Sequence, residues 1–181
     1  MTMTAFFLGL FGPGVLTGLL TLAVWHDLVS FRIPNALIIS GFVLALLMHA
    51  LVPGGLGLLQ SLAGAGVGLA GLLPFYIARA MGAGDVKLLS MIGAFVGPLD
   101  AFGCVLGTYL AGMALAVAVA LYAGVTRKAL RNLRLAAYAT VARLASVEGP
   151  TFDPLSDAAA RLPYTLAIAL GTAGFFAWKL M

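Results

Sequence analysis

The chain has 181 residues, of which 62% are hydrophobic and only 9% are charged. Soluble domains carry about 25% charged residues, so this composition excludes a soluble globular fold. The apolar runs are continuous, which also excludes a transmembrane β-barrel, because barrel strands alternate apolar and polar residues. The sequence therefore predicts an all-α fold: a polytopic bundle of membrane-spanning helices.

Six apolar segments are candidates for membrane spans, which need about 20 residues each. In chain order they are residues 5–24, 36–52, 56–78, 86–96, 101–125 and 162–178. We expect Gly12-Pro13-Gly14 to break and kink the first segment. The fourth is short for a full crossing, and a Gly97-Pro98 break separates it from the fifth. Asp100, just before the fifth segment, is expected to be its N-cap. The many glycines of residues 56–78 should let another helix approach closely.

The only long polar stretch is residues 126–161. In its first half, apolar residues recur at helical spacing while Arg127, Arg131 and Arg134 share another face, which is typical of a basic amphipathic helix on an anionic membrane surface. The second half is rich in Gly, Pro and Asp and is expected to form a loop. No repeat divides the sequence, so residues 1–181 are expected to form one membrane-embedded domain with this loop in the cytoplasm.

The net charge of +4 is interpreted as a signal of topology and not of nucleic-acid binding. Nine of the ten basic residues follow the first, third and fifth segments, and only Lys179 lies on the opposite side. Positively charged loops stay in the cytoplasm, so we expect both termini outside. The nine are Arg32, Arg79, Lys87, Arg127, Lys128, Arg131, Arg134, Arg143 and Arg161.

Two acidic residues, Asp27 and Asp85, fall at cytoplasmic ends of apolar segments. The segment from Asp85 to Val96 has twelve residues, or about 18 Å of helix, whereas the hydrocarbon core is about 30 Å thick. Asp85 should therefore lie below the inner membrane surface, with residues 81–84 dipping in as non-helical backbone. Ionisable groups at such depth are costly and usually functional.

Two carboxyl groups facing one cavity have the chemistry of an aspartic protease. Close like charges cannot both ionise cheaply, so such a pair shares a proton, activates water and polarises the scissile carbonyl. The alternative is that Asp27 and Asp85 each cap or snorkel at a helix end. On residue chemistry alone the two interpretations are evenly matched.

Three stretches resemble the type IV prepilin leader peptidases. Asp27 is followed by a short basic spacer and then Ile33-Pro34-Asn35, as in that family's first motif. Residues 81–88 (MGAGDVKL) resemble its second, a G-x-G-D-x-K motif, and residues 161–171 resemble its last helix. The resemblances occur in the family's order.

The resemblance implies a GxGD-type intramembrane aspartyl protease of the bacterial cytoplasmic (inner) membrane, with Asp27 and Asp85 as its catalytic pair. Such enzymes remove the short basic leader from prepilins at the cytoplasmic face and need no cofactor. The sequence contains no CxxC pair, so it resembles the short subtype serving tight-adherence (Flp-type) pili, and methyltransferase activity is not expected. The partners implied are a prepilin or pseudopilin leader, the lipid bilayer and other pilus-assembly components.

Four further residues are candidates for supporting roles. Gly82 and Gly84 would allow the close backbone approach that a buried turn requires. Lys87 could steady the ionised pair or simply snorkel, and Asn35 could bond near the site or help to start a helix. No metal site is expected, because the single cysteine, Cys104, should be a buried apolar residue.

Two other functions stay open at this point. Membrane acids can form the relay of a proton-coupled transporter or channel, although such a relay would space them through the bilayer. A non-catalytic scaffold for pilus assembly would use the acids only as helix caps.

Overall fold

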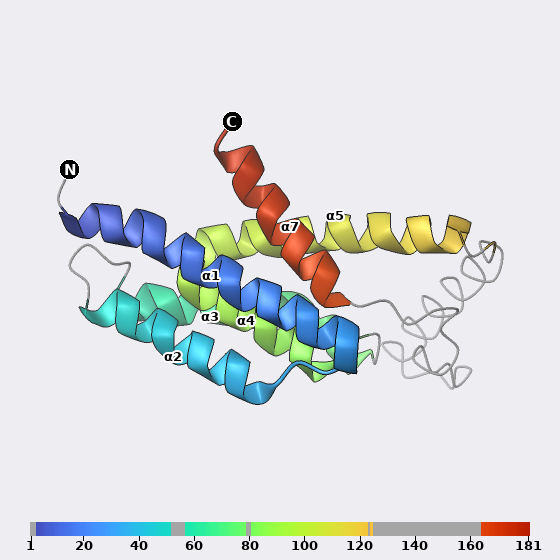
Figure 1. The fold of residues 1–181 in the computed structure, drawn as a ribbon, viewed down its shortest axis with the longest axis horizontal. Coiled ribbons are helices and arrows are strands. Elements are labelled where there is room, and N and C mark those ends of the chain that lie inside the picture. The colour runs from blue at the N-terminus through green and yellow to red at the C-terminus, as the bar shows by residue number, and fades with distance from the viewer. Residues whose placement is uncertain (1–2, 52–56, 79–80, 123, 125–163) are drawn as a thin grey trace, which may run out of the picture.

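The computed structural model describes residues 3–51, 57–78, 81–122, 124 and 164–181, with side chains from Gly12 onward. Within these residues every regular element is an α-helix, which confirms the predicted all-α fold (Figure 1). The helices are α1 (Met3–Ser30), α2 (Asn35–Leu51), α3 (Leu58–Ile77), α4 (Ala83–Val96), α5 (Pro98–Tyr122) and α7 (Tyr164–Lys179). The amphipathic segment expected at 126–161 lies outside the described residues.

Helix length distinguishes two groups. Residues Gly12–Ser30 of α1, together with α3 and α5, are long and apolar enough to cross a membrane. The other described helices are shorter: α2 has 17 residues, α7 has 16 and α4 has 14. At 1.5 Å per residue α4 is about 21 Å long, which is less than the roughly 30 Å of hydrocarbon in a bilayer.

The start and end of two helices differ from the sequence prediction. The expected break at residues 12–14 is wrong, because α1 continues through Pro13 to Ser30 and so includes Asp27 in its last turns. Proline is tolerated in apolar helices of this kind. Residues 81–84 were expected to be non-helical, yet α4 already begins at Ala83. Only Met81 and Gly82 are therefore non-helical.

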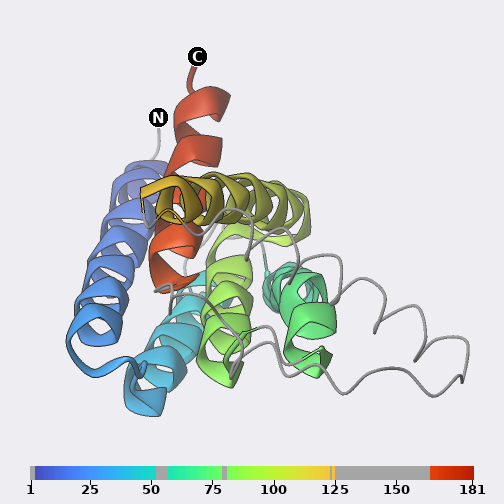
Figure 2. The ribbon, with the colours of Figure 1, turned by 90° about the vertical axis from the view of Figure 1, so that its right-hand side faces the viewer.

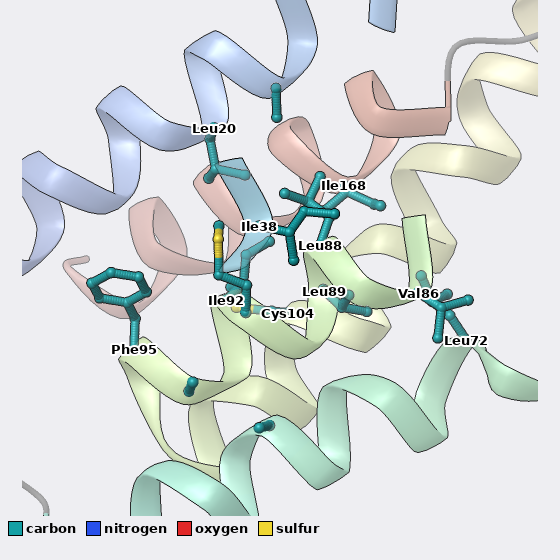
Figure 3. Packing of buried hydrophobic residues seen from close by; sticks show 14 of the residues in the cluster. Leu20, Ile38, Leu72, Val86, Leu88, Leu89, Ile92, Phe95, Cys104 and Ile168 are labelled. Carbon is teal, nitrogen blue, oxygen red and sulfur yellow. The ribbon is translucent and has the colours of Figure 1, made fainter. Parts of the chain in front are cut away.

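The short helix α4 is the centre of the bundle. Its residues Leu88–Phe95 are all buried, and it packs against α2, α3 and α5. Side chains from all the described helices meet around it (Figure 3). A helix that is apolar on every side is expected in such a central position. Because α4 is held on all sides, its first turn, which carries Asp85, has a fixed place at one end of the bundle.

Glycines bring α3 and α4 into backbone contact, as the sequence predicted. A Cβ at Gly64 would overlap the carbonyl oxygen of Gly93, and a Cβ at Gly68 would overlap that of Leu89. Two hydroxyls add bonds between the helices: Ser61 Oγ donates to the Ala94 carbonyl at 2.7 Å, and Ser90 Oγ donates to that of Ala65 at 3.0 Å. Small residues and hydroxyls of this kind hold helices together where lipid removes the hydrophobic drive for association.

The last described helix, α7, crosses α5 obliquely and also packs against α1 (Figures 1 and 2). The crossing is again a glycine contact, because a Cβ at Gly107 would overlap the carbonyl oxygen of Gly171. At the far end of α7, Lys179 Nζ lies 2.6 Å from Asp100 Oδ1 and 2.7 Å from Oδ2. The crossing and this ion pair fix the direction of α7 along the bundle.

The ion pair corrects the predicted role of Asp100. The expected N-cap assignment is wrong: α5 begins at Pro98, and the Gly97 carbonyl accepts the bond from Ala101 N–H. Asp100 is therefore the third helical residue, where its charge favours the helix N-terminus. Its carboxylate bonds Lys179, which in turn lies in the last turn of α7, where a cation is favoured.

The Asp100–Lys179 pair should contribute little to stability. The Lys179 side chain is 51% exposed and that of Asp100 is 25% exposed, and pairs with this much solvent contact are worth about 0.2–1 kcal/mol. A double-mutant cycle with Lys179→Ala and Asp100→Ala, followed by thermal unfolding in detergent, should give a coupling energy in that range. A coupling of several kcal/mol would mean that the pair is a principal anchor of α7.

Candidate active site

One end of the bundle collects polar side chains from four helices. The C-terminal turns of α1 and the first turns of α2, α4 and α7 carry Asp27, Asn35, Asp85 and Thr165. Fourteen residues of α7, or about 21 Å of helix, separate Thr165 from Lys179 and Asp100. The two ends are therefore distinct, and Asp100 does not share a site with the other two aspartates.

Asp27 stands where α1 ends. Its backbone carbonyl accepts the hydrogen bond from Phe31 N–H at 2.9 Å, which closes the helix. Phe31 has a φ of 51°, a left-handed conformation that costs a non-glycine residue about 1–2 kcal/mol. The Phe31 side chain is 60% exposed, so packing of that ring does not explain the strain. Strained backbone of this kind clusters at functional sites.

The turn after α1 brings the two predicted motifs together. Ile33 packs directly against α4, since a Cβ placed on Gly84 would lie 3.4 Å from Ile33 Cδ1. A side chain at position 84 would therefore be in van der Waals contact with Ile33. The Ile33-Pro34-Asn35 segment and the glycine motif, about 50 residues apart in sequence, are therefore neighbours in space.

Asp85 is the third residue of α4 and is half-buried. Its carboxylate accepts a hydrogen bond from the backbone N–H of Gly82, the N-cap residue, as an acid at this position does in a capping box. A second bond comes from another helix, because Thr165 Oγ1 donates to Asp85 Oδ1 at 3.3 Å. Asp85 thus does cap the start of α4, and it also bonds Thr165, a contact that capping does not require.

Asp27 lies close enough to Asp85 for their charged forms to repel each other. Among the described residues, none donates a hydrogen bond to the Asp27 side chain, and neither carboxylate forms an ion pair. The two half-buried acids therefore lie near each other at one end of the bundle.

The predicted supporting residues fall into two pairs. Gly82 and Gly84 flank the start of α4, the first as its extended N-cap and the second against Ile33. Lys87 Nζ donates to Asn35 Oδ1 at 3.3 Å on the exposed side of the site. Within the described part of the chain Lys87 contacts Asn35 and not an aspartate, while Asn35 is the first residue of α2. The pair links α2 to α4 beside the two acids.

Sequence reasoning missed Thr165. It is fully buried, in the first turn of α7, 80 residues after the aspartate that it contacts. It lies within residues 161–171, which resemble the family's last helix, but a single threonine within an apolar segment is ordinary and was not singled out. Only the path of α7 across α5 reveals the contact.

A cavity lies at the other end of the bundle. It has a volume of about 550 Å³ and is lined by α1, α2, α4, α5 and α7, with Asp100 among its lining residues. His49 also lines it and is held 2.9 Å from the Phe95 carbonyl oxygen, away from the two acids. Cys104 is fully buried, as predicted. Among the described residues no three His, Cys, Asp or Glu side chains gather as metal ligands would.

Comparison with known families accounts for the two aspartate motifs. Comparisons with curated proteins and with solved structures found no match. The model of the type IV leader peptidase family matches residues 14–117, which include α2, α3, α4 and both aspartates. This match covers more than half of the 181 residues. The chain therefore belongs to the type IV leader peptidase family, and it is a membrane peptidase.

Proposed function

We propose that the protein is an aspartic endopeptidase that removes the short basic leader from prepilins of the type IV or Flp class. The observation that carries the proposal is the approach of Asp27 to Asp85 at one end of the bundle. Each comes from a different motif, and both lie within the matched family region. A transporter would need acids along the bilayer depth, whereas Asp100, the other described acid, belongs to the opposite end.

The pair would work as one acid and one base. The ionised carboxylate takes a proton from water, and the resulting hydroxide adds to the scissile carbonyl carbon. The protonated partner donates its proton to the carbonyl oxygen, giving a tetrahedral intermediate. When the C–N bond breaks, the leaving nitrogen takes the proton that the first carboxylate accepted from water and becomes the new pilin N-terminus. One hydroxyl of the intermediate returns its proton to the other carboxylate, which leaves the leader with a new carboxyl end. The pair titrates as a unit, so neither role is assigned to one residue.

The length of α4 suggests where this reaction occurs. With about 18 Å of helix from Asp85 to Val96, α4 would leave Asp85 below the surface of a bilayer whose core is about 30 Å thick. The exposed basic residues Arg32 and Lys87 lie at the same end as the acids. Basic residues favour the cytoplasmic side, so we assign this end to the cytoplasmic face of the bacterial inner membrane.

Co-expression with candidate prepilins tests the function directly. Wild-type enzyme should reduce the substrate's mass by that of the leader, with the new N-terminus at the leader junction, as intact mass and N-terminal sequencing would report. The control is the same substrate without the enzyme. If no prepilin is shortened although the enzyme is folded in the membrane, the scaffold function would be favoured instead.

A further inference from the structure

Thr165 makes an unusual contact for a buried threonine. Its side chain is fully buried, and its hydroxyl reaches out of α7 to Asp85 Oδ1 on α4. Hydroxyls in helices commonly bond the carbonyl four residues earlier on the same helix. Thr17, Thr21 and Thr108 all do so here. Thr165 is the second residue of α7, so α7 itself offers no such carbonyl to its hydroxyl.

The position of Thr165 is determined by the helix packing around it. The Gly107–Gly171 contact sets where α7 crosses α5, and Tyr164 packs its ring against Gly112, where a Cβ would lie 2.8 Å from the phenolic oxygen. The adjoining residue, Thr165, is thereby directed toward α4. The contact with Asp85 thus follows from the way α7 packs against α5.

Two donors from different elements then hold one carboxyl group. The Gly82 N–H comes from the start of α4, and the Thr165 hydroxyl comes from α7. Two bonds from different directions restrict the rotation of a carboxyl plane, which one bond does not. A bond of 3.3 Å is long for two oxygens, so its main effect is on orientation. Displacing a reacting group by about 1 Å can reduce a rate by about 100-fold.

We propose that Thr165 is a positioning residue, which orients the Asp85 carboxyl group toward Asp27 and the scissile bond. This inference rests on the proposed function, since it presupposes that Asp85 is catalytic. Thr165 lies beyond residue 117, where the family match ends, so the match does not assign it.

Three variants test the proposal by their cleavage kinetics. Thr165→Val preserves the side-chain shape and removes the hydroxyl, so kcat should fall about tenfold while KM changes less than twofold. Thr165→Ser restores the hydroxyl and should recover most of kcat. Thr172→Val is the matched control: Thr172 is also buried in α7, and its hydroxyl has no nitrogen or oxygen partner among the described residues. Thr172→Val should keep wild-type kcat.

Asp85→Asn in the same assay distinguishes failure of the proposed function from failure of the positioning role of Thr165. If it still cleaves, Asp85 is not catalytic and the proposed function itself fails. If it is inactive while Thr165→Val keeps wild-type kcat, only the positioning role is overturned. Should Thr165→Val fail to fold, Thr165→Ala and Thr165→Ser replace it. A higher kcat for the serine variant supports the role, and equal values overturn it.

Discussion

Asp27→Asn and Asp85→Asn should each reduce leader cleavage by about 10³-fold or more, with the protein still present in the membrane at its normal level. An amide can neither accept the proton of the attacking water nor donate one to the carbonyl oxygen, and general acid–base catalysis contributes about 10²–10⁴-fold. The fold should survive, because the side-chain oxygen of asparagine can still accept the Gly82 N–H bond at the start of α4. Cleavage would be followed as the mass shift of a co-expressed prepilin.

Asp100→Asn is the matched control for both substitutions. It removes the same charge from the opposite end of the bundle and weakens only interactions at that end, which are the exposed ion pair with Lys179 and the favourable charge at the start of α5. Cleavage should therefore continue at nearly the wild-type rate. Near-normal cleavage by either Asp27→Asn or Asp85→Asn would exclude that residue from the chemistry. Loss of cleavage in Asp100→Asn would show that charge at the far end also matters.

Gly64→Leu should destabilise the bundle by about 3 kcal/mol or more, the upper range for overpacking a tight core. Its Cβ would overlap the Gly93 carbonyl oxygen and approach the backbone of Gly97, and backbone atoms cannot move aside as a flexible side chain can. Separation of α3 from α4 would also release the hydrogen bond between Ser61 and Ala94. Thermal unfolding in detergent would measure the loss, and cleavage should fall with it because α4 carries Asp85.

Gly66→Leu provides the comparison on the same helix. Gly66 is exposed, and a Cβ there would meet nothing within 4 Å. Leucine also forms helix more readily than glycine, by roughly 1 kcal/mol. This variant should therefore be at least as stable as the wild type and fully active. Equal destabilisation at the two positions would mean that α3 and α4 are not in close backbone contact.

The helical character of the chain was predictable because apolar runs are a strong signal, and the approximate positions of the helices followed from it. The helix boundaries were less predictable where the local preference of a residue conflicts with the packing of the helix that contains it. Pro13 suggested a break, but the surrounding helix tolerates it, and the glycines of residues 82–84 suggested irregular backbone, but packing of α4 in the centre keeps Ala83 and Gly84 helical. Asp100 looked like a cap because the sequence does not show that α5 already begins at Pro98. Nor does it show that Lys179, 79 residues away, lies beside Asp100.

The candidate site was predictable to the extent that it lies in short motifs. Asp27 and Asp85 stand out as charges in apolar surroundings, and their motifs resemble those of a known family. Lys87 was ambiguous, since the sequence did not indicate that Asn35 would be its partner. Thr165 lies in the stretch that resembles the family's last helix, but nothing local indicates its contact with Asp85, because that contact depends on how α7 crosses α5.

The dependence of Asp85 on a contact from α7 has a consequence for protein synthesis. Thr165 is translated 80 codons after Asp85, so the ribosome completes both aspartate motifs long before the helix that contacts them emerges. A reading frame interrupted between codons 118 and 163 would still encode the whole region that matches the family, residues 14–117. Its product would contain both acids and lack α7. For genes of this kind, an intact family match therefore does not establish that the encoded site is complete.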